Sequence, residues 1–153
     1  MNSHPENTSE LFEMAGLPDN ARIIDLGAGD GSSGCSVCVD IAPRAENVIK
    51  ADFFDLPFPD ESFDAALSQC SFFISGNPQG ALREAHRILK PGGKLLLSDV
   101  FLSEPELPGF RIIKMRDKTE DWRQYYLEML WREENVPQVK GKVKYYLIVA
   151  EKE

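Results

Sequence analysis

Two apolar segments near the start of the chain end in residues that could bind a nucleotide-like ligand. The sequence IIDLGAGDG begins at Ile23 and places Gly27, Gly29 and Gly31 directly after an apolar run. Glycines at such a position let the backbone turn sharply and approach a ligand closely, although a plain tight turn uses the same residues. Asp40 ends the next apolar run, VCVD. A carboxylate there can accept hydrogen bonds from both hydroxyls of a ribose, or it can be a solvated strand end.

Two further segment ends carry polar residues that could complete such a site. Asp52 and Phe53 follow a third apolar segment, where they could hydrogen-bond the amine of an adenine and flank its ring, or simply form a turn. Gln69 and Cys70 end a fourth segment, FDAALSQC. Parallel sheets bind ligands at the carboxyl ends of their strands. We therefore expect all these residues at one edge of a sheet.

The pattern of the whole chain predicts an α/β fold in one domain spanning residues 1–153. Apolar segments predict seven strands at 21–26, 36–40, 47–51, 63–70, 94–101, 110–115 and 144–152. Capping residues and helical spacing predict helices at 7–16, 77–89 and 119–134. Many aliphatic strands with few helices between them favour a mainly parallel sheet.

The charge and composition of the chain limit the classes of partner. The net charge of −8 argues against nucleic acid or an anionic membrane surface as the main partner. No apolar run approaches the ~20 residues that span a bilayer. The chain has three cysteines, and its N-terminus lacks the pattern of a secretory signal. We therefore expect a cytoplasmic protein with reduced thiols.

Four motifs, taken in order, resemble the class I S-adenosylmethionine-dependent methyltransferases. They are IIDLGAGDG, VCVDIAP, ADFFDLPFPDESFD and REAHRILKPGGKLLLSDV. The resemblance covers roughly residues 10–101 and is nearest to the small-molecule methyltransferases of the type 11 group. It implies a Rossmann-like, seven-stranded, mainly parallel sheet, S-adenosyl-L-methionine as the cofactor, and an acceptor that the sequence does not identify. A nicotinamide-dependent oxidoreductase, the rival for a glycine turn, has no reason to carry the last two motifs.

The resemblance also implies which residues bind the cofactor. All lie at or just after strand ends: Asp25, Gly27, Ala28, Gly29, Asp40, Ile41, Asp52, Phe53, Gln69 and Cys70. The first four would surround the methionine part, and the next two would contact the ribose and one face of the adenine. Asp52 and Phe53 would meet the adenine edge, and Gln69 and Cys70 would lie beneath the sulfonium.

The sequence identifies no dedicated catalytic base, and Cys70 is its one candidate for a catalytic role. The sequence SQCSF resembles the arsenite methyltransferases, which carry a cysteine at this position, but no partner thiol is evident here. The alternative is a small residue packed beneath the cofactor. Cys35 and Cys38 form a C-x-x-C without a second pair or a helix N-terminus, so we expect no metal site.

The chain departs from the family pattern in its crossovers. The gaps from Gly31 to Asp40 and from Asp40 to Asp52 are too short for helices, since a helical crossover needs ~10–12 residues besides its strands. Prolines break the segment FLSEPELPG, where a third helix is usual. Several crossover helices are therefore expected to be shortened or missing. A non-catalytic domain that binds the cofactor or a partner is the alternative function that this loss favours.

The missing helices lead to two structural expectations. Aliphatic residues of strands 21–26 and 36–40 should be exposed on one sheet face. The helix at 119–134, with Trp122 and Tyr126 on one side, should cover that face or join a homodimer contact. Little sequence is left for a lid, so a large acceptor, a partner protein or a second subunit should complete the active site.

Overall fold

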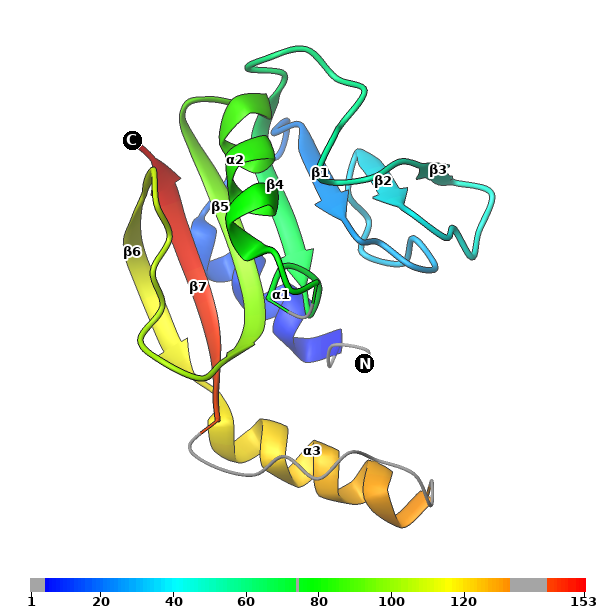
Figure 1. The fold of residues 1–153 in the computed structure, drawn as a ribbon, viewed down its shortest axis with the longest axis vertical. Coiled ribbons are helices and arrows are strands. Elements are labelled where there is room, and N and C mark those ends of the chain that lie inside the picture. Colours follow the sequence, from blue (N-terminus) through cyan, green and yellow to red (C-terminus); the bar gives the residue numbers. More distant parts are fainter. Residues whose placement is uncertain (1–4, 74, 133–142) are drawn as a thin grey trace.

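The sheet at the centre of the protein has the strand order β3-β2-β1-β4-β5-β7-β6 (Figure 1). Its strands are β1 (Ile23–Leu26), β2 (Val37–Asp40), β3 (Val48–Lys50), β4 (Phe63–Gln69), β5 (Leu89–Phe101), β6 (Phe110–Asp117) and β7 (Lys144–Lys152). Only β7 runs antiparallel to its neighbours. This computed structural model describes residues 5–73, 75–132 and 143–153. The predicted seven-stranded, mainly parallel sheet is confirmed.

Two helices pack on opposite faces of the sheet (Figure 1). They are α1 (Pro5–Ala15) and α2 (Pro78–Ile88). The start of α2 follows its sequence signal, because the Asn77 side chain accepts a hydrogen bond from Gly80 N and Pro78 occupies the first turn. The end differs from the prediction, since β5 begins at Leu89 rather than Lys94. Leu89 pairs with Phe63 of β4, which extends the strand back to the end of the helix.

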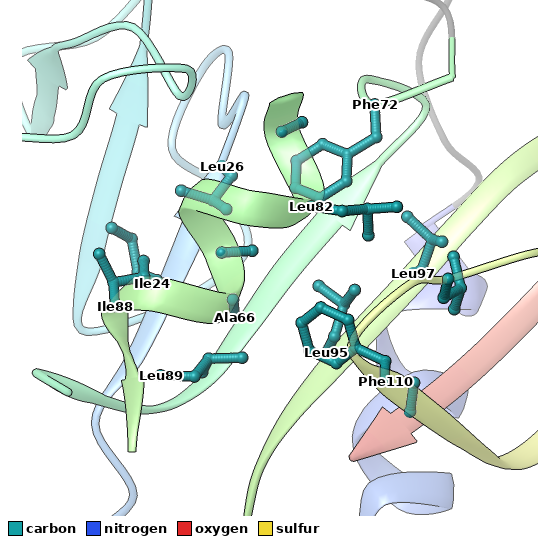
Figure 2. Packing of buried hydrophobic residues seen from close by; sticks show 14 of the residues in the cluster. Ile24, Leu26, Ala66, Phe72, Leu82, Ile88, Leu89, Leu95, Leu97 and Phe110 are labelled. Carbon is teal, nitrogen blue, oxygen red and sulfur yellow. The ribbon is translucent and has the colours of Figure 1, made fainter. Parts of the chain in front are cut away.

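The larger part of the core lies between α2 and the sheet (Figure 2). Leu82 and Ile88 of α2 pack against fully buried residues of β1, β4 and β5, among them Ile24, Leu26, Ala66, Leu95 and Leu97. The opposite face is covered by α1, which buries Leu11 and Met14 against Leu67, Leu96 and Leu147. None of the helices in the described part of the chain combines the length and apolarity that crossing a bilayer requires.

The expected bare face on β1 and β2 is wrong. Ile24, Leu26 and Val39 are 0% exposed and Cys38 is 4% exposed. Alternation explains this result, because most aliphatic residues of both strands point to the α2 face, and Ile23 packs with the cluster around α1 on the other. There they are covered by α2 and by the segment 51–58, which contributes Leu56. The other face of these strands carries Asp25 and Cys38 in paired positions, so few aliphatic atoms need cover.

The third helix, α3 (Thr119–Arg132), does not cover β1 and β2 as expected. Its first turn packs Trp122 in a parallel stack on Tyr145, with ring centroids 6.0 Å apart. The helix then runs on past the end of the sheet (Figure 1). The side chain of Tyr126 lies outside the described residues. A homodimer contact through α3 therefore stays a prediction.

The two short crossovers contain turns and bends in place of helices, as predicted. They are also hydrogen-bonded to each other. Arg44 N donates to Gly29 O at 3.1 Å, and Asn47 Nδ2 donates to Gly31 O at 3.2 Å. The loop after β2 therefore holds the glycine turn after β1 in the place where a helix would usually follow.

Substituting Gly31 should show how tightly the two crossovers fit. Gly31 has a φ of 71°, and a Cβ added there would lie 2.6 Å from Asn47 Nδ2 and 2.8 Å from Val48 Cγ2. We expect Gly31→Ala to lower the free energy of unfolding by about 2 kcal/mol, from backbone strain and overpacking together. Gly34 is the matched control, because its φ is 77° but a Cβ there would meet nothing within 4 Å. Gly34→Ala should cost about 1 kcal/mol in urea unfolding. Equal costs for the two variants would contradict the fit.

Candidate functional site

A cavity of about 780 Å³ lies at the carboxyl ends of β1, β2 and β4. Seven of the predicted cofactor-binding residues line it: Asp25, Gly27, Ala28, Gly29, Asp40, Gln69 and Cys70. Strand order reverses here, since β1 has β2 on one side and β4 on the other. Ligands bind at such switch points, and the volume falls within the ~300–1,000 Å³ of small-molecule sites.

The glycine turn after β1 brings bare backbone to the cavity wall. Gly27 N and Ala28 N both donate to Val39 O, at 3.0 and 2.9 Å, which fixes the turn against β2. Gly27 has a φ of 83°, and a Cβ there would collide with Ser71 Oγ. A side chain at this position is therefore excluded by conformation and by space. The glycine is required because the segment after β4 packs directly on the turn.

Asp40 is held at the end of β2 by two backbone donors. Its Oδ2 accepts from Gly29 N at 2.8 Å, and its Oδ1 accepts from Ala42 N at 2.8 Å. A carboxylate oxygen can accept more than one hydrogen bond, so both oxygens keep capacity for a ligand. The carboxylate is thus fixed in orientation and can still bind two vicinal hydroxyls.

Asp25 lies beneath the glycine turn and is only 4% exposed. Burial raises its pKa to about 6, and the nearby charges of Asp40 and Asp30 act in the same direction. A hydrogen bond with Ser33 favours the ionised form and limits the rise. The carboxylate therefore remains largely charged at pH 7, and it faces a cavity that already holds other acids.

The far wall of the cavity is built by the end of β4 and by α1. Thr8 Oγ1 donates to Gln69 Oε1 at 3.0 Å, so α1 is tied to the strand end. Cys70 follows in a left-handed conformation with a φ of 53°, and its N–H donates to Ser98 O at 2.7 Å. Residues 71–73 then fold back over Asp99, whose Oδ2 accepts from Phe73 N at 3.2 Å.

Asp99 is a buried acid at the end of β5 that the sequence analysis did not single out. It is 0% exposed, and its carboxylate accepts backbone hydrogen bonds from Phe73, Val100 and Ser71. Burial raises its pKa to about 6, while these donors favour the ionised form. The signal was present in the sequence, because LLLSDV places an acid directly after a strongly apolar strand.

The chemistry of Cys70 does not favour a nucleophilic thiolate. Its Sγ lies 3.7 Å from Tyr145 Oη, and burial raises the pKa of the thiol to about 11. The group is therefore a neutral thiol at pH 7. Cys35 behaves in the same way, since burial raises its pKa to about 12. Within the described part of the chain, no three His, Cys, Asp or Glu side chains converge as a metal site would require.

Three of the predicted residues do not line this cavity. Ile41 is 66% exposed beyond the end of β2. Asp52 accepts a hydrogen bond from Phe54 N at 2.9 Å, as in an ordinary turn. Phe53 packs on Phe72 with ring centroids 5.3 Å apart, and its edge lies within 3.9 Å of a Cβ placed on Gly27. Their proposed contacts with adenine stay predictions.

The cavity also has lining residues that the sequence analysis did not assign to it. Phe12 reaches the cavity from α1, and Tyr125 from α3. Ser33 and Arg44 come from the shortened crossovers. No local pattern marks these two, because they reach the cavity only through the contact between the two crossover loops.

Comparisons with known proteins agree with this geometry. A family model described as "Methyltransferase domain" matches residues 34–97. A demethylmenaquinone methyltransferase of Tropheryma whipplei (strain Twist) is 36% identical over 107 residues, which cover 57% of this chain and 45% of that protein. Over this part of its length the chain is similar to the methyltransferases. It spans less than half the length of this methyltransferase relative.

Solved structures show the Rossmann-like fold of the methyltransferase family over nearly the whole chain. A geranyl diphosphate C-methyltransferase of Streptomyces coelicolor A3(2), solved with S-adenosyl-L-homocysteine, has a TM-score of 0.72 at 15% identity. The match covers 96% of this chain and 78% of that one. The [4+2]-cyclase SpnF has a TM-score of 0.73 at 19% identity, covering 97% and 81%. The same fold therefore carries more than one reaction, and the activity must be argued from the site.

Proposed function

We propose that the chain binds S-adenosyl-L-methionine in this cavity and transfers its methyl group to an acceptor. The observation that supports this is the convergence of three features on one cavity: the glycine turn, the oriented Asp40 carboxylate and the Gln69–Cys70 strand end. The cofactor supplies a methyl group on a positively charged sulfur. The similarity to methyltransferases supports the assignment of the cofactor.

The residues present fit this cofactor. Gly27 and Gly29 line the cavity, and Asp40 has acceptor capacity for the two ribose hydroxyls. Asp25, Gly27, Ala28 and Gly29 would surround the methionine part. Gln69 and Cys70 would lie beneath the sulfonium. In this proposal Ile41, Asp52 and Phe53 close on the adenine from outside the present cavity.

In this mechanism the protein acts by orienting and enclosing the reactants. The acids lining the cavity favour a cationic cofactor, and the wall made by α1 excludes water from one side. A neutral Cys70 thiol adds no charge beneath the sulfur and leaves the methyl group to the incoming acceptor. A protein base is unnecessary when the acceptor is already nucleophilic, so the lack of a histidine among the described lining residues is compatible with transfer.

The acceptor and the partners belong to the same proposal. The relatives' names include acceptors as different as demethylmenaquinone and arsenite, so they suggest no single substrate. The short connection between β5 and β6 supports a large acceptor, a partner protein or a second subunit that completes the site. A net charge of −8 supports an acceptor other than nucleic acid. Three free thiols support a cytoplasmic location.

A non-catalytic domain that binds the cofactor is the second candidate. It is favoured by the two crossovers without helices and by SpnF, a cyclase with the same fold. Calorimetric titration with S-adenosylhomocysteine and NADH tests binding, and both functions predict saturable binding of the first ligand only. Binding of NADH without S-adenosylhomocysteine would contradict both. Methyl release from labelled cofactor in cell extract then separates the enzyme from the binding domain.

A further inference from the structure

Arg44 is the one cationic side chain among the described residues that line the cavity. It lies in the short loop between β2 and β3, and its backbone N–H is tied to Gly29 O at 3.1 Å. Its guanidinium folds back over the glycine turn, since a Cβ added to Gly29 would lie 2.5 Å from Arg44 Nη2. This hydrogen bond therefore holds the backbone of Arg44 beside the glycine turn, independently of its side chain.

The guanidinium makes no hydrogen bond or ion pair with the residues that the structure describes. It lies near the exposed carboxylate of Asp30, whose pKa is lowered mainly by hydrogen bonds with Ser32 and further by the charge of Arg44. An arginine offers five N–H donors in a planar group that also stacks on aromatic faces. Here the guanidinium lines the cavity, and its donors have no hydrogen-bond acceptor among the described residues.

The electrostatics of the turn explain why a cation belongs there. In nucleotide-binding folds a helix begins just after the glycine turn, and its N-terminus supplies about half a positive charge to the ligand. Here residues 31–36 form no helix. Three acids, Asp25, Asp30 and Asp40, line the cavity at the turn. Arg44 lies at the glycine turn and carries a full positive charge.

The strand order indicates which part of a ligand Arg44 would contact. Gly29, which the guanidinium covers, donates its N–H to Asp40 Oδ2. Arg44 therefore lies at the β2 end of the cavity. Gln69 and Cys70 lie two strands away, after β4. Since the ribose is assigned to Asp40 and the sulfonium to Gln69 and Cys70, the guanidinium is on the nucleoside side.

We propose that Arg44 binds the nucleoside half of the cofactor, donating to ribose or purine acceptors and replacing the positive charge of the missing helix. This inference rests on the proposed cofactor. It concerns a residue of the shortened loop and not the glycine turn itself. Arg44 is thus a binding residue that the loss of a helix makes necessary in this chain.

Two ligands separate the halves of the cofactor. S-adenosylhomocysteine carries both halves, whereas 5′-methylthioadenosine carries the nucleoside and the sulfur without the amino acid. We expect Arg44→Ala to weaken both ligands by a similar factor of about ten, the lower end of what a charged donor contributes. Arg44→Lys should retain part of the affinity. Arg83→Ala removes an exposed arginine from α2 and should leave both affinities unchanged.

The outcomes distinguish this inference from the proposed function. A wild type that binds neither ligand would overturn the proposed function and this inference with it. Unchanged affinities in Arg44→Ala, with a wild type that binds, would overturn the role of Arg44 alone. A loss confined to S-adenosylhomocysteine would overturn it too, because the guanidinium would then pair with the ligand carboxylate. Thermal melts of each variant confirm that the fold is intact.

Discussion

Replacing Asp40 with alanine should weaken the binding of S-adenosylhomocysteine by roughly 10- to 150-fold. The substitution removes a charged acceptor for the ribose hydroxyls, an interaction that contributes about 1.5–3 kcal/mol. It also releases Gly29 N and Ala42 N, so the turn loses the donor contacts that orient it. Isothermal calorimetry measures the loss, and circular dichroism checks that the secondary structure is unchanged. Asp19→Ala, at an exposed turn acid, is the control and should bind normally.

An analogue separates the ribose contact from a loosened turn. Wild type should discriminate between S-adenosylhomocysteine and its 2′,3′-dideoxy form, because only the first offers hydroxyls to Asp40. Asp40→Ala should bind the two with similar affinity. If the variant still discriminates as strongly as wild type, Asp40 is not the ribose acceptor, and the assignment of the cavity to this part of the cofactor fails.

The protein should be more stable at pH 5 than at pH 7.5, by roughly 3 kcal/mol from two buried acids. Burial raises the pKa of both Asp25 and Asp99 to about 6. A carboxyl with a higher pKa in the folded than in the unfolded state takes up its proton more readily when folded. Stability therefore rises as the pH falls from about 6 towards 4, and each acid contributes about 1.4 kcal/mol between pH 7.5 and pH 5.

Other carboxylates set the lower limit of this pH window. Ion pairs and hydrogen bonds lower the pKa of Glu10, Asp64 and Glu84, so these groups stay ionised at pH 5 and lose their contribution only in more acid solution. Urea unfolding at several pH values measures the effect. The falling net charge also favours the folded state, so Asp99→Asn is the comparison that isolates one acid: its pH slope should be about half as steep. Equal or lower stability of wild type at pH 5 would contradict the prediction.

The strand ends that form the cavity were predictable from the sequence. Segments such as IIDL and VCVD carry an acid at or next to their last residue, and parallel strands bring such ends to one edge, so Asp25, Asp40 and Gln69 were expected together. Local pattern was sufficient there, because each residue is positioned by its own strand.

Two features were not predicted, for different physical reasons. The burial of β1 and β2 could have been predicted from the sequence, since alternation places Ile24 and Leu26 on one face and Asp25 on the other. The expectation of exposed aliphatic residues instead considered only the number of missing helices. The position of Arg44 was not readable. It depends on a hydrogen bond between two loops that are separate in sequence, and no periodicity records such a contact.

The short crossovers also alter the entropy of folding, although by little. Ile24 pairs with Val37, and Cys38 pairs with Val48, so each parallel pairing closes a loop of only about a dozen residues. A helical crossover would roughly double that length, at an extra closure cost of about 0.6 kcal/mol. Burying one leucine or valine side chain contributes about 1.5–3 kcal/mol, which is more than this saving. Loop closure therefore cannot replace the apolar face of a lost helix. The half of the sheet that contains β1 and β2 must depend for its stability on the cluster that Ile24, Leu26 and Val39 form beneath α2.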